Sequence, residues 1–235
     1  MKIGRFLFFQ MLVCLLCITV LTHKASADVT VDFLYGIQDS ADCTNGVLLK
    51  IQLERNGETE EIFAGETLEV GAWADPQSVE IPSDYIGQEF TLVWVIDPLG
   101  DINCDWLVIG EPWLVVNGAK EYSFFDSYDE AEYTTVDVDG ESLSHGDGEA
   151  GRDAMWDDAG ALFVQLPWSK EHGIDSIPDS VGGVLCEGAI FAHPPQKGPT
   201  SGGTTAVRFE IFLADVSSVS STGKLTTTWG DLKSR

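Results

Sequence analysis

The sequence predicts an all-β protein whose strands form an antiparallel β-sandwich. Residues 47–54 and 205–213 alternate apolar and polar side chains with a period of two, which is typical of strands with one buried face. Turn signals such as Asn56-Gly57 recur about every 8–12 residues between short apolar runs. After residue 27 no segment shows the periodicity of a long amphipathic helix, so we expect less than about a tenth of the chain to be helical.

Residues 1–27 are interpreted as a signal peptide. Two basic residues precede an apolar run from Phe6 to Leu21, and Ala25-Ser26-Ala27 provides small residues before Asp28. The alternative is a signal anchor, but the run is shorter than the ~20 residues that a membrane span needs. No later segment is long and apolar enough to span a membrane. We therefore expect a secreted protein, extracellular or periplasmic, whose mature chain covers residues 28–235.

The expected mature chain is strongly acidic. Residues 1–27 contain three of the 13 basic residues and no acid, so ten basic residues face 38 acidic ones, a formal charge of −28. Nucleic acids and anionic membrane surfaces attract basic patches, so this charge argues against both as partners. It suits a divalent cation, or a surface that is simply well solvated.

The first predicted unit covers residues 28–118. Its early strands are expected at residues 29–35, 47–54, 60–64, 67–73 and 79–81. The stretch 89–116 organises the unit, because its first segment is apolar on nearly both faces, as in a strand covered on each side. A loop with three aspartates follows, then an apolar segment at 106–109. We expect Glu111-Pro112 to break that segment from 113–116, because proline cannot donate to a strand ladder.

Residues 119–215 are expected to hold an acidic loop region and further strands. One or two strands are expected within residues 122–138, and residues 139–160, rich in glycine and aspartate, are interpreted as a long loop. Later strands are predicted at residues 161–166, 184–193 and 205–213. They either complete the first sandwich or form a partial second unit. Residues 216–235 are rich in serine and threonine and are interpreted as a C-terminal tail.

Three cysteines remain in the expected mature chain: Cys43, Cys104 and Cys186. An exported protein can form disulfides, and an odd number leaves at least one thiol free or paired between chains. We favour a Cys43–Cys104 disulfide, because both residues lie in acidic loops beside predicted strands of the first unit.

Several short motifs resemble a jelly-roll family of secreted bacterial proteins. They are Gly36-Ile37 with Asp39, Gly46-Val47, Tyr85 with Gly87, and Asp105-Trp106 with Gly110 and Pro112. That family is similar to NPCBM and galactose-binding-like modules, so the resemblance implies a jelly-roll sandwich and, by association, sugar binding. Residues 188–195 resemble a strand and loop that usually precede the Gly-Ile motif, whereas here they follow it. The resemblance assigns no ligand residues.

Five aspartates form a candidate calcium site: Asp39, Asp42, Asp97, Asp101 and Asp105. They lie on loops that are expected to meet at one edge of the sandwich, and carboxylate oxygens are the ligands that Ca²⁺ prefers. Galactose-binding-like sandwiches often carry a structural calcium, so the resemblance supports this expectation. The alternative is that these acids are solvated loop charges.

Trp73, Trp156 and Trp168 are the candidate sugar-binding residues, because exposed aromatic faces at loop edges can stack on sugar rings. Trp94 lies in mid-strand and is expected in the core, and Trp106 and Trp113 are expected to pack. No GxSxG, HExxH or phosphate-binding glycine motif is present. The favoured hypothesis is therefore a secreted, non-catalytic carbohydrate-binding protein. The alternatives are a structural or adhesion domain of the cell envelope that binds protein and, less favoured, a glycoside-active enzyme.

Overall fold

The computed structural model confirms an all-β antiparallel sandwich. It describes residues 27–67, 69–100, 103–136, 142–147, 162–166, 179–194 and 203–214. Residues 28–214 form one compact unit, in which the described helical segments are two short 3-10 turns, Ser83–Tyr85 and Tyr128–Glu130. None of the described residues belongs to a helix long and apolar enough to cross a membrane. The predicted signal peptide, except Ala27, and the tail at 216–235 lie outside the described residues.

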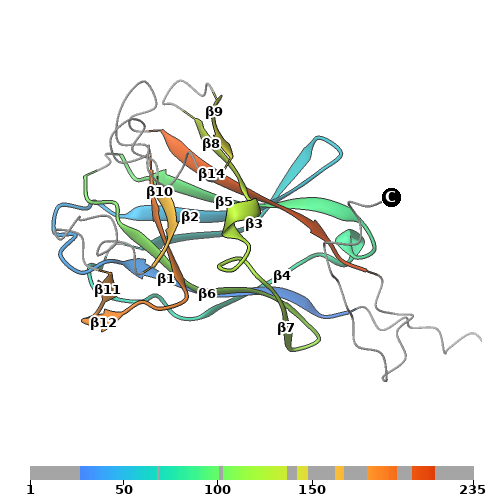
Figure 1. The fold of residues 1–235 in the computed structure, drawn as a ribbon, viewed down its shortest axis with the longest axis horizontal. Coiled ribbons are helices and arrows are strands. Elements are labelled where there is room, and N and C mark those ends of the chain that lie inside the picture. The colour runs from blue at the N-terminus through green and yellow to red at the C-terminus, as the bar shows by residue number, and fades with distance from the viewer. Residues whose placement is uncertain are drawn as a thin grey trace, which may run out of the picture. The chain divides into compact units, whose positions relative to one another are not determined.

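The described strands form two six-stranded sheets and a separate hairpin (Figure 1). Sheet A has the order β10 (Leu162–Gln165), β13 (Ala189–His193), β6 (Leu107–Val116), β1 (Val29–Ile37) and β4 (Gln77–Glu80), with β7 (Ala119–Ser123) beside β6. Sheet B has the order β3 (Glu58–Thr67), β2 (Val47–Arg55), β5 (Glu89–Pro98), β14 (Thr204–Phe212), β8 (Glu132–Val136) and β9 (Ser142–Asp147). The hairpin pairs β11 (Ser180–Val181) with β12 (Val184–Leu185).

The strand order is that of a jelly roll in which the chain begins at the third strand and the first two strands come last. When β13 and β14 are placed before β1, eight strands give the neighbours β13-β6-β1-β4 in one sheet and β3-β2-β5-β14 in the other, the two four-stranded sheets of a jelly roll. The late strands lie inside these sheets, because β13 pairs with β6 and β14 pairs with β5. Residues 189–212 therefore belong to the same sandwich as the strands of residues 28–118.

The core between the sheets is rich in aromatic side chains. Trp94 of β5 is buried, as the sequence predicted, and its ring lies 5.1 Å from that of Phe33 in β1 and 5.6 Å from that of Phe124. Phe124 in turn lies 5.0 Å from Phe209 of β14. All three pairs meet edge to face, a favourable arrangement for aromatic rings. Strands from both ends of the chain thus contribute to one core.

The structure corrects several expected strand bounds. Residues 67–73 were expected to form a strand, but β3 ends at Thr67 and the following segment makes only isolated bridges to the end of β1. Gly71 has φ 69°, which turns this segment across β1. Residues 139–160 were expected to be a loop, yet β9 lies within them and pairs with β8. The hydrogen bonds between β8 and β9 join backbone groups and need no hydrophobic pattern, so the composition of residues 139–160 did not predict a strand there.

The predicted strand at 184–193 is divided in two. β12 ends at Leu185 and β13 begins at Ala189. Gly188 between them has φ 69°, a backbone conformation that favours glycine and redirects the chain. As a result β12 belongs to the hairpin, whereas β13 enters sheet A.

Candidate functional site

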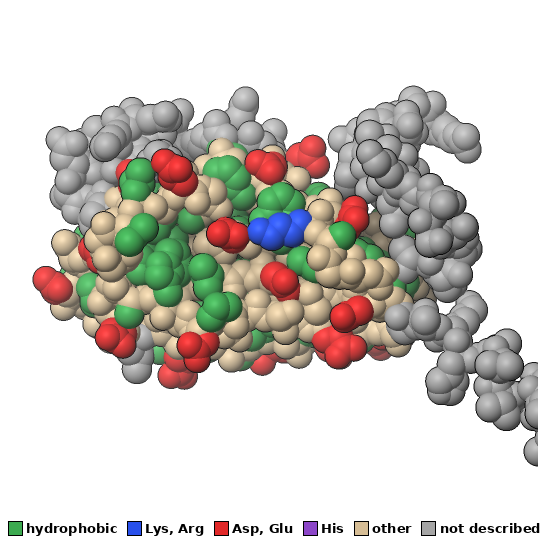
Figure 2. Space-filling view, turned by 90° about the horizontal axis from the view of Figure 1, so that it is seen from below, with side chains coloured by type: hydrophobic (Ala, Val, Ile, Leu, Met, Phe, Trp, Pro, Cys, Tyr) green, Lys and Arg blue, Asp and Glu red, His purple; other side chains and the backbone are tan. Residues whose placement is uncertain are grey.

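A β-bulge in β6 shapes the outer face of sheet A, the face that Figure 2 shows from below. The predicted break at Glu111-Pro112 is wrong, because β6 continues through both residues. Against β1 the register shifts, so that Asp32 pairs with Trp113 and Leu34 pairs with Gly110. A bulge tolerates proline, and Glu111 takes the left-handed φ of 46°. The extra residue places Gly110 and Trp113 on the same face, although they are three positions apart.

Trp73 lies on this outer face. Its segment crosses the end of β1, where the Ala74 N–H donates a hydrogen bond of 2.8 Å to the Tyr35 carbonyl oxygen. A Cβ atom built on Gly110 would lie 3.1 Å from Cη2 of Trp73 and 3.4 Å from Cβ of Leu34. Glycine at position 110 therefore lets the indole ring approach the strand closely. Trp73 remains partly exposed beside Leu34, so the sheet presents an aromatic surface to solvent.

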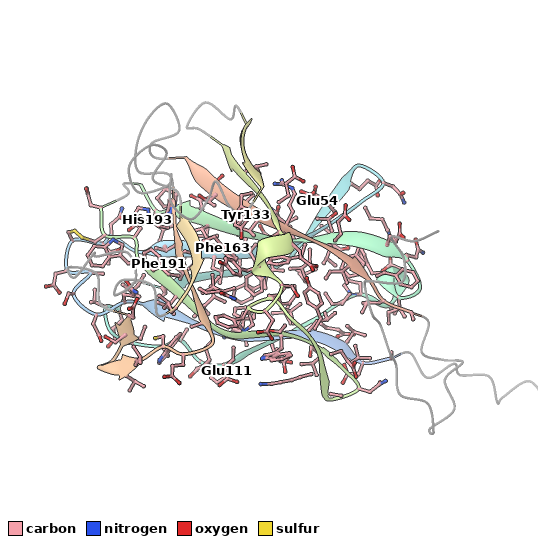
Figure 3. All side chains as sticks on the ribbon, viewed as in Figure 1. Glu54, Glu111, Tyr133, Phe163, Phe191 and His193 are labelled. Carbon is pink, nitrogen blue, oxygen red and sulfur yellow. A yellow bond between two sulfur atoms is a disulfide. The ribbon has the colours of Figure 1, made fainter. Side chains whose placement is uncertain are left out.

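Asp32 adds a carboxylate to the same face. Its Oδ1 atom accepts hydrogen bonds from the hydroxyls of Thr30 and Ser78, both 2.7 Å long. Trp113 lies opposite Asp32 in the register, and the Lys120 ammonium lies 5.1 Å from the centre of the Trp113 ring. Lys120 also forms an ion pair of 3.0 Å with Glu111, whose side chain lies on the outer side of the lower layer in Figure 3. An aromatic ring, a fixed carboxylate and neighbouring hydroxyls thus share one face.

The hairpin of β11 and β12 covers part of sheet A with apolar side chains. Val181 and Cys186 from the hairpin region pack with residues of sheet A and its edge, namely Val108, Leu166, Ala189 and Phe191. Trp73 and Trp106 pack against this cluster. Cys186 is a free, buried thiol, and burial raises its pKa to about 11.

Asp39 fastens the hairpin to the end of β1. Its carboxylate accepts hydrogen bonds from the Ser180 hydroxyl at 2.6 Å and from the N–H groups of Gly182 and Gly183, both at 2.8 Å. Both glycines have positive φ, as a two-residue hairpin turn requires. The Ser180 hydroxyl, helped by the two glycine N–H groups and opposed by desolvation, holds the pKa of Asp39 below its usual value.

The structure brings together the two loops that carry the predicted calcium ligands. It confirms the Cys43–Cys104 disulfide, which joins the β1–β2 loop to the β5–β6 loop. The Thr44 hydroxyl donates a hydrogen bond of 2.7 Å to Oδ1 of the buried Asp105, and the Asn45 side chain donates one of 2.9 Å to the Leu99 carbonyl. These contacts hold both loops at one end of the sandwich.

The predicted calcium ligands are nevertheless engaged separately. Asp39 binds the hairpin, Asp97 lies 3.4 Å from the Lys50 ammonium, and Asp42 is exposed. Asp101 lies outside the described residues. In the part of the chain that the structure describes, no three acidic, histidine or cysteine side chains come together as a metal site. As placed, the described aspartates do not form one ligand set, and the calcium site stays a prediction.

Of the predicted sugar-binding tryptophans, the structure places Trp73 on a partly exposed face, whereas Trp156 and Trp168 lie outside the described residues. Trp106 packs on the apolar cluster, as predicted. Sequence reasoning missed Asp32, although the alternation of β1 places it on the outer face, and it missed the partly exposed position of Trp113, which depends on the bulge. The available signal was a proline inside an otherwise apolar run.

In comparisons with known proteins, no family model, no curated protein and no solved structure matches this chain. The resemblance to galactose-binding-like modules therefore stays a prediction.

Proposed function

We propose that the protein is a secreted, non-catalytic carbohydrate-binding protein whose binding face is the outer face of sheet A. The observation that carries this proposal is the partly exposed Trp73 ring, seated on Gly110 with Asp32 on the same face. Sugar rings have apolar C–H faces that stack on aromatic rings, and their hydroxyls donate to carboxylates. Both kinds of group are present here on a rigid sheet.

The surroundings of Asp32 suit the recognition of hydroxyls. Both hydrogen bonds described for this carboxylate end on Oδ1, which leaves Oδ2 to accept one from a sugar. The hydroxyls of Thr30 and Ser78 fix the orientation of the carboxylate before a ligand arrives, which reduces the entropy lost on binding. The formal mature charge of −28 favours neutral glycans over sulfated or acidic ones, because like charges repel.

The test is an affinity measurement between the mature protein and a panel of soluble neutral glycans. Trp73→Ala removes the stacking ring, and losing its contact with the ligand should weaken binding by on the order of ten- to a hundredfold. Asp32→Ala should also weaken binding. Gly110→Ala removes neither Trp73 nor Asp32 but puts a methyl group 3.1 Å from the indole ring, so it should displace the ring and lower affinity.

Phe212→Ala is the matched control, because Phe212 is exposed on sheet B and should not affect binding. Circular dichroism and melting must show that each variant is folded. The proposal fails if the folded wild-type protein binds no neutral glycan, or if none of the three variants weakens binding. Binding to a protein partner in place of glycans would support the alternative, an adhesion domain of the cell envelope.

A further inference from the structure

The hairpin of β11 and β12 exposes aliphatic side chains without an evident partner. In the described residues, the exposed large hydrophobic side chains are Val184, Leu185 and Phe212, with 66, 47 and 44% of their surfaces accessible. The first two are consecutive and form all of β12, so their side chains point to opposite sides of the hairpin. Isolated exposed hydrophobic residues are common on protein surfaces, but a contiguous apolar patch often marks a binding surface.

The tip of this hairpin is held rigidly. Asp39 accepts hydrogen bonds from both N–H groups of the Gly182-Gly183 turn, and the Asp39 N–H donates one of 2.9 Å to the Ser180 carbonyl. Beneath the exposed residues, Val181 and Cys186 are buried in the apolar cluster. The aliphatic tip is therefore ordered before any ligand arrives, which favours its use as a contact surface.

The hairpin and Trp73 are neighbours on the same side of sheet A. A Cβ atom built on Gly182 would lie 3.1 Å from the carbonyl oxygen of Gly71, two residues before Trp73. Trp73 also packs against the cluster that contains Val181. Figure 2 shows apolar side chains gathered on this face toward the end where Figure 1 places β11 and β12, with acidic side chains around them and few basic ones in view.

The charge of the protein restricts what can cover this apolar surface. Glu187 and Asp75 are exposed close to the hairpin and to Trp73 in the sequence, and the mature chain carries a formal charge of −28. A second copy of the chain or an anionic membrane would bring like charges together. A neutral ligand with an extended apolar surface avoids this repulsion.

We propose that this face binds the flat surface of an insoluble, neutral polysaccharide. The inference rests on the proposed function: Trp73 and Asp32 engage one chain of the polymer. Val184 lies on the same side of the hairpin as Val181, which packs in the cluster beside Trp73, and contacts the C–H groups of a neighbouring chain. A short soluble oligosaccharide held by Trp73 and Asp32 leaves β12 in water. Burial of the aliphatic tip is therefore gained only on a surface where polymer chains lie side by side.

The experiment compares two kinds of ligand on the full mature protein. Depletion of protein from suspensions of microcrystalline cellulose and of chitin powder measures surface binding, and titration calorimetry with cello- and chito-oligosaccharides measures soluble binding. The double variant V184S/L185S keeps the turn glycines and Asp39. It should lower the affinity for the powder at least about tenfold and leave the affinity for the oligosaccharide unchanged. F212S, on sheet B, should change neither.

The outcomes separate this inference from the proposed function. Binding of the oligosaccharide without binding of either powder, or powder binding that the double variant does not weaken, would overturn the inference and leave the proposed function standing. Binding of neither kind of ligand would overturn both. Sedimentation that shows a wild-type dimer, lost in the double variant, would identify a second copy as the occupant of the tip and also overturn the inference.

Discussion

Asp39→Asn tests whether this carboxylate holds the β11–β12 hairpin. The substitution keeps the size of the side chain but removes its charge and replaces one acceptor oxygen with an NH₂ group, which would face hydrogen-bond donors. Three donors lie 2.6–2.8 Å from the carboxylate: one hydroxyl and two glycine N–H groups. A hydrogen bond to a charged group contributes about 1.5–3 kcal/mol when it is protected from water. Because both glycines are exposed and water can replace their partner, we expect a total loss of about 2–3 kcal/mol.

The loss should depend on pH in a defined direction. The pKa of Asp39 in the folded protein lies below its usual value, whereas an unfolded aspartate titrates near ~3.9. A carboxyl group with a depressed folded pKa contributes stability above its unfolded pKa, and this contribution is lost as the pH falls through the folded pKa. The stability difference between wild type and Asp39→Asn should therefore be complete at neutral pH and should close below about pH 4.

Two measurements on the protein test whether Asp39 holds the hairpin. Urea denaturation at neutral and acidic pH gives the free energy of unfolding, and hydrogen exchange at the amides of Gly182 and Gly183 reports local opening of the hairpin. Asp42→Asn is the control, because Asp42 lies exposed in the same loop. The reasoning is refuted if exchange and stability are unchanged at neutral pH, or if the difference persists undiminished in acid.

Three further predictions follow from burial and from the acidic loops. Trp94→Ala should lower the free energy of unfolding by about 3–5 kcal/mol in a denaturant titration, and a midpoint equal to that of wild type would contradict a core position. At pH 8 iodoacetamide should alkylate Cys186 slowly in the native protein and rapidly in denaturant, because burial raises the thiol pKa to about 11; equal rates would contradict this burial. If the loops bind calcium, chelator should lower the melting temperature, and Asp101→Asn should reduce that response. Asp39→Asn should destabilise the protein with or without chelator. A melting temperature that changes with neither chelator nor calcium would contradict the calcium prediction.

Local pattern was sufficient to predict the strands that have one buried face. Val47, Leu49, Ile51 and Leu53 were assigned to the core from their period of two, and all four are fully buried in β2. The mid-strand position of Trp94 likewise predicted its burial. In these cases the burial of apolar surface decides which side chains face the core, and the alternation of neighbouring residues shows this directly.

The role of Asp39 was beyond such local reasoning. Its hydroxyl donor, Ser180, lies 141 residues away in the chain, and no local pattern links the two. A loop with several aspartates predicts cation binding, because carboxylates repel each other without a partner. Here N–H groups and a hydroxyl supply that partner for Asp39. A search of the sequence for oxygen ligands cannot tell an aspartate that binds a cation from one that accepts hydrogen bonds from the protein, because both roles need the same carboxylate.

The candidate binding face depends on strands from both ends of the chain. Gly110, on which the Trp73 ring rests, pairs with Leu34 of β1 on one side and with Ala189 of β13 on the other. Without β13 the open edge of β6 would expose unpaired backbone groups, and without β14 the doubly apolar strand β5 would have a similar open edge. Residues 28–118 carry most of the recognisable motifs but lack both neighbours. Because β13 pairs along β6 beside Gly110, we expect the seat of Trp73, and with it the proposed binding face, to need β13 as well as residues 28–118.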